Sequence, residues 1–145
     1  MVLLCACHES DNEQILDQLD QVIESKGLYA VRFERRVDSL RRELCTASND
    51  PMRWRPANRL FDSYITYNID TAARYVALMY DLAEHTGRRD MKFLSTTCDI
   101  SVLIGRNNIE DAYDRIRSLD TAGITKRMRA NYYTQQMVVY GRLAS

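Results

Sequence analysis

A short pattern, Asn-Ile-acid-any-Ala, occurs twice in this chain, at residues 68–72 and again forty positions later at residues 108–112. Each copy has the chemistry of a helix start, because an Asn side chain accepts a hydrogen bond from a first-turn N–H and the helix macrodipole favours an acid there. A second similarity links residues 102–106 to residues 138–142, thirty-six positions further on. Two helices in a period of 36 to 40 residues are the signature of a stacked helical repeat, although similar caps also arise in a plain helical bundle.

The chain is poor in residues that break helices, with two prolines and five glycines among its 145 residues. This scarcity favours long helices over a fold with many turns. Side chains that can cap a helix predict starts at Ser10, Asn68, Asp90, Asn108 and Thr125. Ser10 also forms a capping-box pattern with Glu13, and Gly87 is expected to end the helix that starts after Asn68.

Before residue 46 the sequence predicts two helices, separated at Gly27. The first has an apolar stripe at Ile15, Leu16, Leu19, Val22 and Ile23. The second, over residues 29–45, has its stripe at Phe33, Val37, Leu40 and Leu44. Two prolines and several turn residues predict a loop near residues 46–57. We therefore predict one all-α domain over residues 1–145, made of antiparallel helical hairpins stacked as a short α-solenoid of about six to eight helices.

Residues 98–124 resemble a pentatricopeptide repeat. In that family the first helix ends near a Gly-Arg, a Glu-x-Ala element opens the second helix, and a Gly-Ile follows it. Residues 105–106, 110–112 and 123–124 match these three marks. The resemblance covers residues 60–145, and residues 7–28 are similar to the second half of such a repeat. No base-reading position is carried over, and the tetratricopeptide pattern fits less well because its Trp, Gly and Tyr landmarks are not in place.

The formal net charge is zero, so the chain has no global field that attracts polyanions. Seventeen of its twenty basic residues are nevertheless arginines, whose guanidinium groups bind phosphate or carboxylate in a bidentate manner. The candidate residues for binding RNA or an acidic partner are Arg32, Arg35, Arg36, Arg41, Arg42, Arg53, Trp54 and Arg55. The alternative is that the arginines are only solvated. Trp54 either stacks on a base or anchors a partner protein, or it folds back over the hydrophobic edge of the domain.

No nucleotide-binding, nucleophile-elbow or zinc-protease motif occurs, so we expect a protein that is not an enzyme and has no cofactor. Cys5, Cys7 and His8 could bind a metal, but a buried apolar turn is the favoured interpretation, and no metal site is predicted.

The four cysteines lack the spacing of a disulfide framework, which indicates a reducing, intracellular compartment. The apolar start is too short for a signal peptide, and no stretch approaches the roughly 20 apolar residues of a membrane span.

The last predicted helix has apolar residues spread around it rather than along one stripe, and its candidate interface residues are Tyr132, Tyr133, Met137 and Tyr140. We therefore expect self-association or obligate docking through this helix.

The sequence predicts a non-catalytic helical-repeat scaffold or adaptor that works within a larger assembly. The pentatricopeptide resemblance implies an organellar ribonucleoprotein, such as a mitochondrial ribosome or RNA-processing complex. The alternative is an adaptor that binds only proteins and makes no RNA contact.

Overall fold

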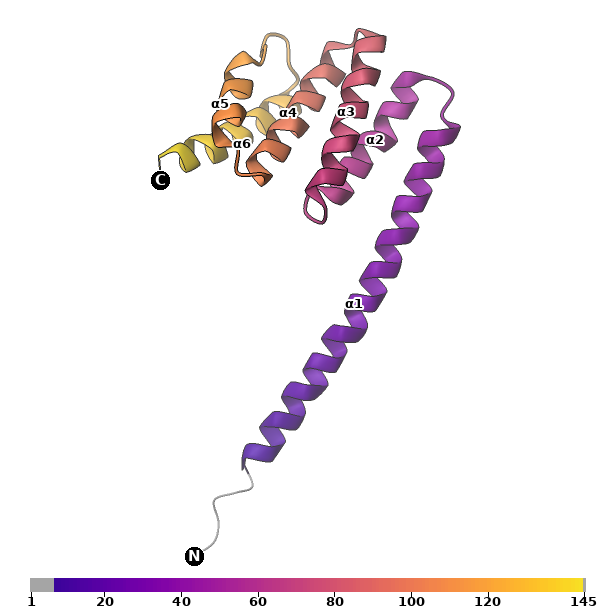
Figure 1. Ribbon diagram of the computed structural model, residues 1–145, viewed down its shortest axis with the longest axis vertical. Helices are drawn as coiled ribbons and strands as arrows, with labels where there is room; N and C mark the ends of the chain where they lie inside the picture. Colours follow the sequence, from indigo (N-terminus) through magenta and orange to yellow (C-terminus); the bar gives the residue numbers. More distant parts are fainter. Residues whose placement is uncertain (1–6, 145) are drawn as a thin grey trace, which may run out of the picture. The chain divides into compact units, whose positions relative to one another are not determined.

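The computed structural model describes residues 7–144, with side chains described from residue 14 onward. These residues form six helices and no strand (Figure 1). The helices are α1 (Cys7–Thr46), α2 (Asp50–Tyr64), α3 (Ile69–Thr86), α4 (Arg89–Gly105), α5 (Ile109–Ser118) and α6 (Lys126–Leu143). The all-α class predicted from the sequence is confirmed.

The chain divides into two compact units, Met1–Arg36 and Val37–Ser145, and the boundary falls inside α1. We call the first the N-terminal unit and the second the repeat unit. The described part of the N-terminal unit is entirely helical. All described side chains before Phe33 are exposed, and this unit therefore has no buried core of its own among the described residues.

In the repeat unit each helix packs against the next helix along the chain. Helix α3 lies between α2 and α4 (Figure 1), while α4 and α5 both contact α6. Each of these five helices contributes one fully buried large side chain: Leu60, Met79, Ile100, Ile116 and Val139. A core built from successive helix pairs confirms the stacked hairpins that the repeat pattern predicted.

Three of the predicted helix starts are confirmed by side-chain caps. The side-chain oxygen of Asn68 accepts a hydrogen bond from the Thr71 N–H at 2.9 Å, and Asn108 makes the equivalent contact at 3.4 Å. The Thr125 hydroxyl caps α6 in the same way. The prediction for Asp90 is wrong, because Arg88 occupies the cap position without a side-chain cap bond. Asp90 lies in the first turn, where the macrodipole favours a carboxylate.

The predicted helix break at Gly27 is also wrong, since α1 continues through it without interruption. Ser10 likewise lies inside α1 rather than at its start. A glycine in a helix interior costs about 1 kcal/mol relative to alanine, which lowers stability but does not by itself end a helix. No proline follows Gly27 within α1 to enforce a stop. A single weak breaker is therefore outweighed by the good helix formers on both sides.

The loop predicted near residues 46–57 is mostly helical, because α2 already begins at Asp50. The Asn49 side chain caps it by accepting a hydrogen bond from the Met52 N–H at 3.0 Å. Pro51 lies in the first turn, where no intrahelical partner exists for the N–H that proline lacks. Pro56 lies further inside the helix and is fully buried, so packing offsets the lost hydrogen bond.

Candidate interaction surfaces

The repeat unit contains a hollow of about 780 Å³, formed by α3, α4, α5, the connection between α5 and α6, and the start of α6. Its apolar lining comes from Tyr80, Phe93, Leu119, Ile124 and Met128. The volume lies in the range of sites that bind small molecules or side chains of a partner, which run from roughly 300 to 1,000 Å³. Phe93 and Met128 are buried, so the floor belongs to the core of the unit.

Basic side chains surround this apolar floor. The lining includes Arg88, Arg89, Lys92 and Arg115 and only two acids, Asp90 and Asp120, which gives it a formal charge of +2. Arg88 donates to Asp90 at 2.6 Å, and Arg89 pairs with Asp120. The Arg88 guanidinium lowers the pKa of Asp90, and the Ala122 N–H, followed by Arg89, lowers the pKa of Asp120. Both carboxylates therefore stay ionised at neutral pH. The other two bases pair with acids outside the lining, Lys92 with Glu84 and Arg115 with Asp99 at 3.1 Å.

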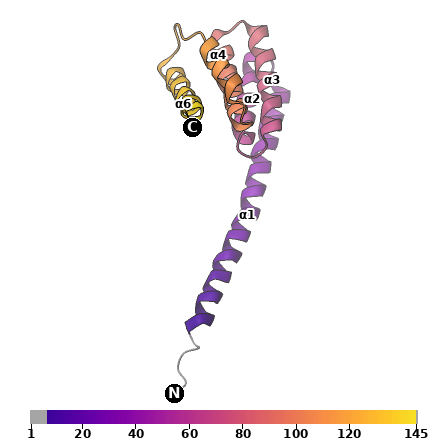
Figure 2. The ribbon, with the colours of Figure 1, turned by 60° about the vertical axis from the view of Figure 1, so that its left-hand side comes forward.

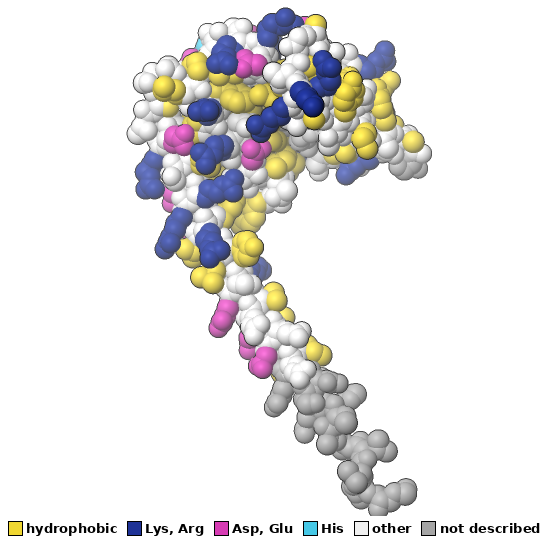
Figure 3. All heavy atoms as spheres, turned by 180° about the vertical axis from the view of Figure 1, so that it is seen from behind, with side chains coloured by type: hydrophobic (Ala, Val, Ile, Leu, Met, Phe, Trp, Pro, Cys, Tyr) yellow, Lys and Arg dark blue, Asp and Glu magenta, His cyan; other side chains and the backbone are white. Residues whose placement is uncertain are grey.

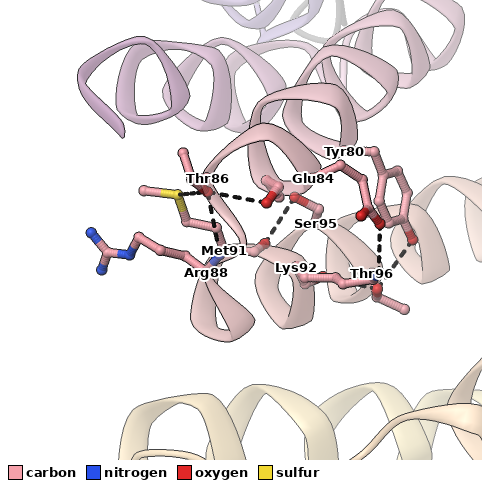
Figure 4. A network of polar contacts seen from close by, with 9 residues as sticks. Tyr80, Glu84, Thr86, Arg88, Met91, Lys92, Ser95 and Thr96 are labelled. Carbon is pink, nitrogen blue, oxygen red and sulfur yellow. Dashed lines mark hydrogen bonds and ion pairs between the residues drawn. The ribbon is translucent and has the colours of Figure 1, made fainter. Parts of the chain in front are cut away.

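Polar contacts hold the α3–α4 corner beside the hollow (Figure 4). The Thr86 hydroxyl donates to the Ala83 carbonyl at 3.0 Å and accepts from the Arg88 N–H at 3.4 Å. Across the two helices, Tyr80 donates to the Thr96 hydroxyl at 3.2 Å. Burial raises the pKa of Tyr80, which keeps the phenol protonated as a donor. These bonds fix one wall of the hollow, so the site is formed before any partner binds.

Trp54 is in the core of the repeat unit and not on its surface. Only 7% of the residue is exposed, and its indole N–H donates to the Ser95 hydroxyl at 3.2 Å. Ser95 is itself fully buried and donates to the Met91 carbonyl at 2.9 Å. Burial agrees with the interpretation in which Trp54 folds back over the hydrophobic edge. The indole is not available for stacking on a base.

The predicted arginines are divided between the two units. Arg32, Arg35 and Arg36 belong to the N-terminal unit, and the remaining ones, Arg41, Arg42, Arg53 and Arg55, belong to the repeat unit. Arg41 donates to the Tyr64 hydroxyl at 3.0 Å, and Arg53 lies 3.6 Å from Asp50. These two have local roles within the fold. The basic residues around the hollow were missed because no motif marks them, although Arg88, Arg89 and Lys92 are close in the sequence.

The residues predicted as an interface on α6 lie on two of its faces. Val139 is fully buried, and Tyr132 packs on the cluster around it. Tyr133, Met137 and Tyr140 are 54%, 76% and 42% exposed, and their spacing of four and three residues places them on one outward stripe. The Tyr140 ring meets Tyr113 edge-on at 5.7 Å. The outward stripe is the part of the predicted interface that the fold leaves uncovered.

The candidate metal ligands Cys5, Cys7 and His8 lie outside the residues whose side chains are described. Among the described residues no group of three His, Cys, Asp or Glu side chains is placed to hold a metal. Cys98 is mostly buried, and burial raises the pKa of its thiol well above the usual range, so it is unreactive at neutral pH. No described helix is long and apolar enough to cross a membrane.

Comparison with known families matches residues 23–145 to the SusR N-terminal TPR domain. The chain belongs to this family. No curated protein and no solved structure shows a significant match. The tetratricopeptide-type domain confirms the helical-repeat class predicted from the sequence but not its pentatricopeptide form. TPR domains typically serve as non-catalytic scaffolds for contacts between proteins.

Proposed function

We propose that this TPR protein is a non-catalytic scaffold that binds an acidic segment of a partner protein in the hollow beside α4. The observation that carries the proposal is the combination of an apolar floor with a basic rim in one preformed cavity. An apolar side chain of the partner would fill the space over Phe93 and Met128. Carboxylates beside it would face Arg88 and Lys92 at the rim.

The partner is expected to be acidic because of the charge balance in the hollow. The bases of the lining outnumber the acids of the lining by two, and their ion pairs lie on an exposed rim, where carboxylates of a partner can exchange with the acids that pair with them. Ion pairs at such a rim contribute little affinity each, about 0.2 to 1 kcal/mol, but they discriminate strongly against basic partners. The apolar floor therefore supplies affinity, and the rim supplies specificity.

Fluorescence polarisation with labelled peptides tests this proposal. One peptide series combines bulky apolar residues with Asp and Glu, and the matched series replaces the acids with Lys. The acidic series should bind and lose affinity as salt rises. Arg89→Ser with Lys92→Ser should weaken binding about tenfold, and Ile124→Asp at the floor should abolish it. Arg55→Ser is the control, because Arg55 is an exposed base on α2 that does not line the hollow.

Equal binding of the acidic and lysine series would contradict the proposal. So would rim variants that bind like the Arg55→Ser control. Single-stranded RNA belongs in the same assay, because RNA contact and a mitochondrial location remain predictions that rest on composition and on the pentatricopeptide resemblance. Steep salt-dependent RNA binding together with no peptide binding would favour the ribonucleoprotein alternative.

A further inference from the structure

The outward stripe of α6 is an uncovered apolar surface. Within the repeat unit α6 lies beside α4 (Figure 2) and contacts both α4 and α5, and its residues Met128 and Val139 are buried. On its outward side Tyr133 and Met137 are more than half exposed. Helices α3 and α4, by contrast, have helices packed on both sides. The outward stripe therefore has the character of a helix face that a further helix would cover.

The charges on α6 indicate what kind of helix fits there. The helix contains the bases Lys126, Arg127, Arg129 and Arg142 and no acid. Three of these bases lie in its first four residues, where the macrodipole disfavours positive charge. An acidic neighbour would offset this unfavourable arrangement. The occupant expected from these features is an acidic amphipathic helix of about the same length as α6, which has 18 residues.

The N-terminal unit of the same chain supplies a helix of this kind. Its apolar side chains Ile15, Leu16, Leu19, Val22 and Ile23 are between 53% and 61% exposed. Apolar side chains are visible on the surface of α1 in Figure 3. Together with Tyr29, which is 72% exposed, they mark a stripe over residues 15–29, comparable in length to the 18 residues of α6. This stripe, which we call the α1 stripe, has acids at residues 17, 20 and 24 beside it and a single base, Lys26, before residue 28.

The composition of the α1 stripe favours α6 over a second α1 as its partner. Ile15 and Val22 add a row of apolar side chains beside Leu16, Leu19 and Ile23, and this wider face suits a helix in a bundle more than the narrow seam of a two-stranded coiled coil. Pairing two copies of the acidic segment would also bring its carboxylates together. On α6 the same carboxylates would meet only bases.

From this match of length, apolar spacing and opposite charge we infer that the protein self-associates head to tail. The α1 stripe of one copy packs on the outward stripe of α6 in a second copy. The interface is heterologous, because two different surfaces meet, and each chain therefore carries one donor and one acceptor surface. The outward stripe shares no residue with the lining of the hollow beside α4, so this inference does not rest on the function proposed above.

Mixing two complementary variants tests the inference. The α1 variant combines Leu16→Ser and Leu19→Ser, and the α6 variant combines Tyr133→Ser and Met137→Ser. All four residues are more than half exposed, so circular dichroism should show unchanged helix content. Sedimentation velocity is run on each variant alone and on the equimolar mixture. The matched controls are Gln21→Ser on α1 and Asn131→Ser on α6, both exposed and off the two stripes.

We expect the wild type and the controls to associate at micromolar concentration. Each variant alone should associate about 100-fold more weakly, because each truncated side chain is worth about tenfold. The mixture should form a 1:1 dimer, since it still contains one intact surface of each kind. Three results would overturn the inference: a monomeric wild type, an α6 variant that still self-associates, or a mixture that stays monomeric.

Discussion

The buried contact between Trp54 and Ser95 makes a sharp prediction about stability. Ser95→Ala removes the acceptor of the indole N–H at 3.2 Å, and nothing else in the described structure hydrogen-bonds that N–H. Leaving a buried donor unsatisfied costs about 1 to 3 kcal/mol. Trp54→Phe removes the donor and also part of a buried ring, so lost packing adds to the lost bond, and we expect about 2 to 4 kcal/mol.

The double variant separates the hydrogen bond from the packing. Once Trp54→Phe has removed the donor, Ser95→Ala no longer strands a polar group, and its additional cost should fall by about 1 kcal/mol. The control is Ser63→Ala. The Ser63 hydroxyl makes the same type of bond to a carbonyl four residues back, at 2.8 Å, but on an exposed surface. It should change the free energy of unfolding by no more than about 0.5 kcal/mol.

Urea unfolding followed by circular dichroism measures the four variants against the wild type. Trp54 is the only tryptophan in the chain, so its fluorescence gives a second readout. Native emission should be blue-shifted, and acrylamide should quench it far less than in the unfolded chain. The reasoning is refuted if the native indole is quenched as strongly as the unfolded one, or if Ser95→Ala costs no more than Ser63→Ala.

Three further predictions concern helix ends and one buried charge. In urea unfolding, Asn68→Ala should destabilise the repeat unit by about 1 kcal/mol and Asn108→Ala by less. The reason is that the cap hydrogen bond of Asn68 is 2.9 Å long and that of Asn108 is 3.4 Å long, and equal costs would contradict this. Asn107 has a φ of 58°, a left-handed conformation that glycine adopts more easily than alanine. Asn107→Ala should therefore cost about 1 kcal/mol of stability and Asn107→Gly little, and the reverse order in thermal melts would refute the left-handed conformation at this residue. Burial raises the pKa of Asp99 above its ordinary value of 3.8, which means that its ionised form costs the folded state stability. Relative to Asp99→Asn, the wild type should therefore lose stability as the pH rises through the range just above the ordinary pKa of the carboxyl group. Free energies of unfolding of both proteins, measured between about pH 3 and 7, show whether the difference changes in this direction.

Local chemistry was enough to predict most helix starts. Asn68, Asn108 and Thr125 each cap a helix through a bond to an N–H three residues on, and such a bond depends on neighbours in the sequence alone. The same local reasoning failed at Gly27 and over residues 46–57. At these positions, whether a helix forms depended on the sum of several weak helix propensities. For Pro56 it also depended on burial against other helices.

The hollow beside α4 could not be predicted from the sequence. Its lining comes from α3, α4, α5 and the connection to α6, with Tyr80 and Met128 far apart along the chain. No spacing pattern links them, because only the packing of the helices brings them together. Trp54 illustrates the same limit, since the sequence left exposure and burial of its side chain both open, and the structure buries it in contact with Ser95.

The two halves of α1 show most directly what sequence and tertiary structure each determine. Leu16 and Leu19 have the same spacing as Val37 and Leu40, and periodicity predicted an apolar face for both pairs. Leu16 and Leu19 are 58% and 53% exposed, whereas Val37 and Leu40 are each only 2% exposed. Periodicity depends on the geometry of a single helix and can be read from the sequence. Burial depends on whether another element lies against that face, and only the tertiary structure decides that.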